Sequence, residues 1–133
     1  MTETIEYFKA LAERIGLIFQ RLSDLGASDL IKTINLNVAT NLEITDDENS
    51  SNISLVISRE KQEVVAEKNP ALNFIIKSSK DMWVRVFSGE ESLISNVISG
   101  EAKVSNIRAN WLNSMMFSIL ISTLLSLKII KFK

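Results

Sequence analysis

The feature of this sequence that most constrains its folding is a long uncharged segment near the C-terminus. Residues 109–127 contain no charged side chain, and large apolar residues recur around most of the circumference of the helix that the segment can form. Small polar residues at every fourth position make only a narrow stripe: Asn110, Ser114, Ser118, Ser122 and Ser126. Such a helix must be buried in protein, covered by a ligand or partner, or placed in lipid.

One interpretation of this segment is a membrane-spanning helix. Its nineteen uncharged residues come close to the roughly 20 that cross a bilayer, and the lysines that follow would be flanking charges. The small polar stripe would then be a face for helix pairing. Seven of the positions are polar, however, which lowers the tendency to span a membrane. We therefore expect a helix that folds back over the protein, with a tail-anchored or dimerising interaction module as the alternative function.

The composition indicates one folded domain over residues 1–133. Apolar residues make up 46% of the chain and charged residues 23%, so the chain can bury a core and does not have the composition of a disordered tail. The formal net charge of −1 gives no electrostatic reason to expect a nucleic-acid partner. Glu3, Glu6 and Glu13 stand where an export signal needs a basic start and an unbroken apolar centre, so we expect a cytoplasmic protein.

Two residue types that carry much of protein chemistry are absent from the sequence. Without cysteine there is no disulfide, thiolate metal site or cysteine nucleophile. Without histidine, the commonest general base and the usual partner of a serine nucleophile are missing. Ser92, Ser95 and Ser99 lie outside any nucleophile-turn motif, which leaves a serine–lysine arrangement as a minor alternative. We expect no enzyme activity, no cofactor and no metal site.

The first half of the chain predicts one helix and then a series of strands. Between residues 2 and 25, apolar side chains recur at steps of three and four, as on one face of an α-helix. A further helical turn is expected over 28–33. From 36 to 44, apolar and polar residues alternate, which predicts an antiparallel strand with one buried face. Three more strands are expected along the chain: 53–57, 64–66 and 72–76.

Two glycines eleven residues apart divide the next part of the chain. Ser78 with Asp81 predicts the start of a short helix, and Gly89 predicts its end. A second short helix then ends at Gly100, and a fifth strand is expected over 101–106. Glycine suits both helix ends because it adopts a left-handed backbone conformation without steric cost.

This order of elements resembles the sterol carrier protein domain, also called non-specific lipid transfer protein. The likeness runs from about residue 21 to residue 127, and its most specific part is the interval from Gly89 to Gly100, with Ile98 just before the second glycine. Asn106 stands where the family commonly has a glycine after the last strand. The resemblance implies an α+β fold in which a five-stranded, mainly antiparallel sheet packs against N-terminal and C-terminal helices.

The resemblance also implies a non-catalytic function, the binding or transfer of a lipid in an apolar cavity between the sheet and the C-terminal helices. The implied ligand is fatty acyl, isoprenoid or sterol-like, and each methylene that it buries contributes about 0.8 kcal/mol. The positions expected to face this cavity are Phe74, Trp83, Phe87, Leu93, Val97, Leu112, Met115, Met116, Ile119 and Leu120. For the aromatic residues and methionines among them, ordinary core filling is the other interpretation.

Two charged segments, one basic and one acidic, bear on possible membrane and metal-ion partners. Lys128, Lys131 and Lys133 alternate with apolar residues in a basic tail that either contacts anionic headgroups of a membrane or only keeps the chain end solvated. The acidic run 46–48 lacks the glycine and the spaced glutamate of a calcium loop, so we expect a solvated turn there. The expected partner is thus a lipid or other apolar small molecule, and the alternatives left open are transient contact with a membrane surface and a homodimer.

Overall fold

Five strands form one mixed sheet in the computed structural model of this chain, which describes residues 4–26, 37–46, 52–58 and 60–126. The strands are β1 (Asn37–Ile44), β2 (Asn52–Ser58), β3 (Gln62–Val65), β4 (Ile75–Ser78) and β5 (Lys103–Val104). Their order across the sheet is β3-β2-β1-β4-β5. β4 runs parallel to β1, whereas the other neighbouring pairs are antiparallel. The predicted α+β fold with a mainly antiparallel sheet is confirmed.

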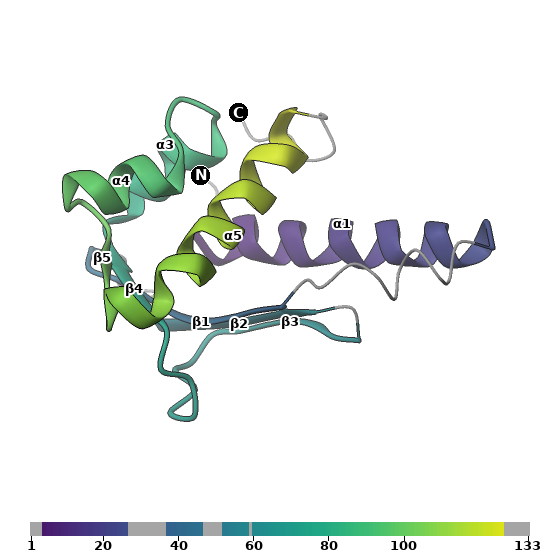
Figure 1. Ribbon diagram of the computed structural model, residues 1–133, viewed down its shortest axis with the longest axis horizontal. Helices are drawn as coiled ribbons and strands as arrows, with labels where there is room; N and C mark the ends of the chain where they lie inside the picture. The colour runs from purple at the N-terminus through teal and green to yellow at the C-terminus, as the bar shows by residue number, and fades with distance from the viewer. Residues whose placement is uncertain (1–3, 27–36, 47–51, 59, 127–133) are drawn as a thin grey trace.

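The helices of the described residues cover one side of this sheet (Figure 1). They are α1 (Thr4–Asp24), α3 (Lys80–Phe87), α4 (Leu93–Ser99) and α5 (Ile107–Ser126). The N-terminal and C-terminal helices therefore both pack on the sheet, as expected. The helical turn predicted over 28–33 and the basic tail lie outside the described residues.

The alternation in the first two strands places their aliphatic side chains against the helices. Val38 lies opposite Ile57 and Leu42 opposite Ile53 in the register of β1 and β2, and all four are fully buried. On the opposite face of β1, the loop after β3 covers Asn41. Its Nδ2 donates to the Asn69 carbonyl at 2.8 Å, and its Oδ1 accepts from the Asn69 N–H at 2.8 Å. The sheet is therefore covered on its second face at this position.

The short helices begin and end where serine and glycine predicted, except that the capping serine of α3 differs by one residue. Gly89 and Gly100 have φ angles of 86° and 90°, the left-handed conformation expected after the two short helices. The capping serine of α3 is Ser79, whose hydroxyl accepts from the Met82 N–H at 3.1 Å. The prediction that Ser78 caps this helix is wrong, because Ser78 is still the last residue of strand β4.

Aromatic side chains from three helices meet at the centre of the core. Phe8 of α1 lies edge-to-face against Trp83 and Phe87 of α3, with ring centroids 4.9 Å and 5.3 Å apart. Phe117 of α5 approaches Phe8 at 6.4 Å. All four side chains are fully buried. Such aromatic pairs add to the free energy gained by burying the rings, and they hold α1, α3 and α5 together above the sheet.

Candidate functional site

The ten residues predicted to face a lipid occupy three different environments. Four are buried in the core: Phe74, Trp83, Phe87 and Leu93. Three are partly buried and pack against that core: Val97, Met116 and Leu120. Three lie on the exposed side of α5: Leu112, Met115 and Ile119. The structure thus brings seven of the ten to one core between sheet and helices, and their contact with a lipid stays a prediction.

The orientation of α5 explains why the last three residues lie outside. The first three residues of the small polar stripe, Asn110, Ser114 and Ser118, face the protein and are buried, whereas Ser126 at the end of the stripe is exposed. The Ser118 hydroxyl accepts from the Ile94 N–H in the first turn of α4 at 3.1 Å. Ser118 therefore lies at the seam between α4 and α5, where its small side chain allows the two helices to approach closely. Most of the large apolar side chains on the opposite side of α5 then point outward.

The core contains a hydrogen-bond donor without an acceptor. Trp83 is 0% exposed, so water cannot reach its indole Nε1, and this atom has no hydrogen-bond partner in the protein. Buried polar groups in native proteins are almost always paired, and an unpaired one costs about 1–3 kcal/mol. The hydroxyl of Ser78, on the neighbouring strand end, is also buried without a partner.

Four surface hollows of the described residues lie away from the ten predicted positions. The largest, about 550 Å³, is at the start of α5 and is lined by Asn73 and residues 106–110. A hollow of about 280 Å³ lies at the ends of β4 and β5, and one of about 420 Å³ lies along residues 14–22 of α1. None of the ten predicted residues lines any of these hollows. The apolar cavity between sheet and C-terminal helices therefore stays an expectation.

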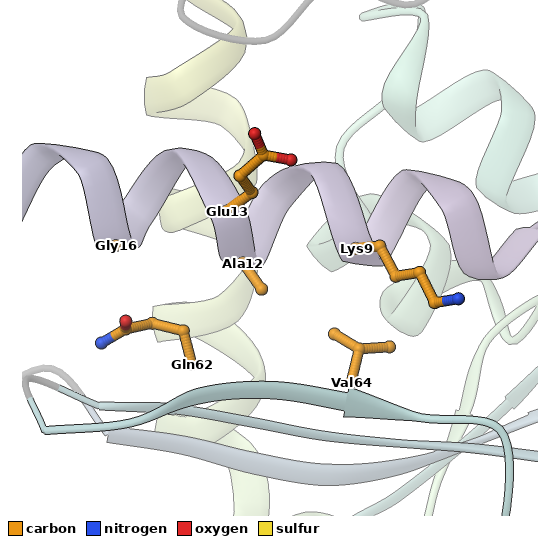
Figure 2. Close-up of a pocket in the computed structure, with 6 residues that line it drawn as sticks. All are labelled: Lys9, Ala12, Glu13, Gly16, Gln62 and Val64. Carbon is orange, nitrogen blue, oxygen red and sulfur yellow. The ribbon is translucent and has the colours of Figure 1, made fainter.

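The fourth hollow, of about 310 Å³, lies between α1 and the edge strand β3 (Figure 2). Ala12 of α1 and Val64 of β3 point toward each other across it, whereas Glu13 points away. Gly16 keeps the gap open, because a Cβ at this position would lie 3.0 Å from Oε1 of Gln62. This hollow leaves no signal in the sequence, since its two walls are far apart in the chain and each has an ordinary amphipathic pattern.

One partly buried arginine connects α3 with the segments that follow it. Arg85 lies 3.6 Å from Asp81 and 3.5 Å from Glu91, and its Nη2 forms an ion pair with Glu101. It thereby connects α3 with both ends of the segment that carries α4. Sequence reasoning missed this cluster, because only the Asp81–Arg85 spacing is visible along a helix. Within the described ranges, no group of three or more His, Cys, Asp or Glu side chains could hold a metal ion.

A membrane-spanning helix was one interpretation of the C-terminal segment. Of the part of the chain that the structure describes, no helix combines the length and the apolar character needed to cross a bilayer.

Comparison with solved structures identifies the fold. The crystal structure of sterol carrier protein 2 superposes with a TM-score of 0.56 at 12% sequence identity, covering 87% of this chain and 91% of that one. The chain has the sterol carrier protein fold. Sterol carrier protein 2 from Yarrowia lipolytica matches with a TM-score of 0.52 at 15% identity, and the coverage is 86% of both chains. The sterol carrier fold also occurs in "UbiJ-SCP2 Ubiquinone synthesis protein", with a TM-score of 0.50 at 16% identity, over 71% of this chain and 73% of that one.

Other comparisons are less informative than the sterol carrier structures. The sec-alkylsulfatase Pisa1 from Pseudomonas sp. matches with a TM-score of only 0.44, and this chain spans 13% of its length. No protein-family model matches the sequence, and no curated protein matches it. The sterol carrier fold is therefore established by structure and not by sequence similarity.

Proposed function

We propose that this protein binds or transfers a lipid, without catalysis, in the space between its sheet and helices α3, α4 and α5. The observation that carries the proposal is the sterol carrier fold, which extends over 87% of the chain. The proposal treats residues 1–133 as one lipid-binding domain. A sterol and a prenylated quinone, the molecules to which the neighbours' names refer, are both large and apolar with few oxygen atoms. The ligand class is accordingly fatty acyl, isoprenoid or sterol-like.

In this proposal, Trp83 supplies the polar contact of the site. Its buried indole N–H has no acceptor in the core, and a carbonyl or hydroxyl oxygen of the lipid removes the resulting penalty. The apolar remainder of the lipid lies against the surrounding core residues, where burial of methylenes provides most of the binding free energy. A lipid with an oxygen-bearing head is therefore preferred over a plain hydrocarbon.

The lipid enters by separation of α5 from α4. Ser118, at their seam, buries few apolar atoms, so opening the seam there costs less hydrophobic free energy than opening a leucine-lined seam. Water can replace the hydrogen bond between the Ile94 N–H and Ser118. Met116 and Leu120 are partly buried against the core on the flank of α5 away from Ser118, where the apolar part of the lipid lies in this proposal.

The first test is extraction of the purified protein with organic solvent, followed by mass spectrometry, together with uptake of a fluorescent fatty acid. We expect a co-purifying acyl, isoprenoid or sterol-like lipid. Met116→Trp and Leu120→Trp should each lower the bound lipid several-fold, because a larger side chain fills space beside the core. Thr123→Trp, on the exposed side of α5, is the matched control and should leave the load unchanged. A protein that contains no lipid and takes up no fatty acid would refute the proposal.

The role of Trp83 has its own test. Trp83→Phe removes the N–H and keeps an aromatic ring, so the affinity for an oxygen-bearing lipid should fall by about tenfold, the equivalent of one hydrogen bond. The affinity for a hydrocarbon of similar length should change much less. Displacement of a fluorescent probe measures both. Equal losses for the two ligands would mean that the variant only disturbs packing.

A further inference from the structure

The outward side of α5 is a strip of large apolar residues, which we call the outer face of α5. Its members are Ile107, Trp111, Leu112, Met115 and Ile119. Leu112 is 74% exposed and Ile119 is 60% exposed. At 100° per residue, the last four members occupy about 100° of the helix circumference, with Ile107 at the edge of this arc. The inward side of the same helix holds the small polar stripe, so α5 turns much of its apolar surface away from its own core.

An exposed strip of this kind indicates that something covers it. Single exposed apolar side chains are common on proteins, but contiguous apolar patches mark sites of interaction with a partner or a membrane. The outer face of α5 contains one charged residue, Arg108, which lies within the arc at the start of the helix. Trp111 lies one turn further along. A tryptophan beside a cation is the combination that membrane interfaces favour, because the indole ring is apolar with one polar edge.

The distribution of charge along the chain decides which partner fits. Residues 102–133 contain five basic residues and no acidic one. Residues 1–101 contain the other ten basic residues and all sixteen acidic residues, a formal charge of −6. In the described part of this segment, residues 102–126, Lys103 and Arg108 are exposed and no residue is acidic, so a symmetric dimer built on the outer face of α5 would bring like charges together, and like charges repel. An anionic lipid surface attracts the same segment, by about 1 kcal/mol per basic residue near the headgroups.

From this juxtaposition we propose that the outer face of α5 docks on the surface of an anionic lipid bilayer. The helix, about 30 Å long, lies in the plane of the membrane, with its apolar side chains at the boundary between headgroups and acyl chains. Arg108 and Lys103, both exposed, contact the lipid phosphates. The inference does not depend on the proposed lipid site in the core, since docking uses the opposite side of α5.

Sedimentation of the full-length protein with vesicles tests this proposal. We expect binding to vesicles of phosphatidylcholine and phosphatidylglycerol in equal amounts, with much weaker binding to phosphatidylcholine alone and weaker binding in high salt. The double variant Leu112→Gln/Ile119→Gln should bind at least about tenfold more weakly, because two large apolar contacts are lost. Tryptophan emission should shift to shorter wavelength on binding. The shift reports Trp111, since the only other tryptophan, Trp83, is already fully buried.

The control is the double variant Leu17→Gln/Leu25→Gln on α1, where the two leucines are 48% and 79% exposed. It removes a similar exposed apolar area and should bind vesicles as the unchanged protein does. Retained binding by the Leu112/Ile119 variant, or equal binding to neutral and anionic vesicles, would overturn the proposal. A dimer in solution that the same variant dissociates would also overturn it, and would assign the outer face of α5 to a second copy of the chain. Uptake of fatty acid in the absence of vesicles reports the core site separately.

Discussion

At the scale of single residues, two positions show how backbone geometry limits the choice of side chain. Gly100, at the end of α4, has a φ angle of 90°, and Asn106, between β5 and α5, has a φ angle of 48°. Glycine adopts this conformation freely, and asparagine adopts it more easily than other residues. Asn106 therefore provides the left-handed backbone conformation for which the sterol carrier family commonly has a glycine after its last strand. A departure from the family pattern is accommodated without a change of fold.

Gly100→Val tests the cost of this geometry. Nothing lies within 4 Å of a Cβ built at this position, so the variant meets no steric obstacle and only the backbone is strained. We expect the free energy of unfolding to fall by about 1–2 kcal/mol, measured by urea denaturation. Gly100→Asn should cost clearly less. Equal midpoints for the two variants would contradict the argument that backbone conformation sets the penalty.

At the scale of elements, the seam between α4 and α5 joins the two helices by hydrogen bonding as well as by packing. Ser118 of α5 accepts from the Ile94 N–H, one of the N–H groups that the first turn of α4 cannot satisfy internally. The hydroxyl of Ser114 donates to the Asn110 carbonyl within α5 at 2.9 Å, which satisfies it locally. Ser118 thus acts as a cap for the first turn of α4.

Ser118→Ala should destabilise the protein by about 1–2 kcal/mol, because the Ile94 N–H loses its acceptor. The matched control is Ser126→Ala at the end of the same helix, where the side chain is exposed. Thermal melting of both variants measures the difference. If the two variants melt at the same temperature, the hydrogen bond across the seam contributes nothing to stability.

Arg85 also connects elements of the fold. Its guanidinium group neutralises three carboxylates that approach it from different segments. Arg85→Met keeps much of the alkyl stem but removes the charge, so the carboxylates then repel one another. We expect a loss of about 1–2 kcal/mol in low salt and a smaller loss in high salt, where the repulsion is screened. Lys61→Met, which breaks an exposed ion pair with Glu63, is the control and should change stability little. A salt-independent loss would point to packing instead of charge.

At the scale of the whole molecule, the two sides of α5 serve two different proposed contacts. The inward side closes the space above the sheet, where the fold and the unpaired Trp83 donor support a lipid site. The outward side carries apolar residues with Arg108 among them and fits an anionic membrane surface. In these two proposals, α5 contacts a membrane with one side and closes the lipid site with the other.

This arrangement predicts where a bound lipid stabilises the molecule. At a free concentration 100 times its dissociation constant, a lipid that binds only the folded state adds about 2.7 kcal/mol of stability. Hydrogen exchange should slow most along α4 and α5, which close the site, and less along β1 and β2, which are already the centre of the sheet. Mass spectrometry of exchange with and without the lipid checks this. Uniform slowing across all elements would contradict the closing role of α5.

The sequence by itself determined the order and type of the elements, because the patterns that specify them are local. Alternation over 36–44 predicted β1 without reference to the rest of the chain, and Gly89 and Gly100 marked the ends of two short helices. The α+β class, the mainly antiparallel sheet and the likeness of fold to sterol carrier protein followed from that order. The prediction failed at two boundaries. The strand expected over 72–76 is β4 at Ile75–Ser78, and Ser79 caps α3 because Ser78 still belongs to that strand.

Only the tertiary structure decided which side of α5 faces inward. A helix that is apolar around most of its circumference carries no pattern strong enough to orient it, so its orientation depends on partners distant in the chain, above all on α4 and the Ile94 N–H. The unpaired donor of Trp83 and the carboxylates around Arg85 likewise arise from segments that meet only after folding. Local periodicity fixes what a segment becomes, whereas long-range packing fixes what each of its faces contacts.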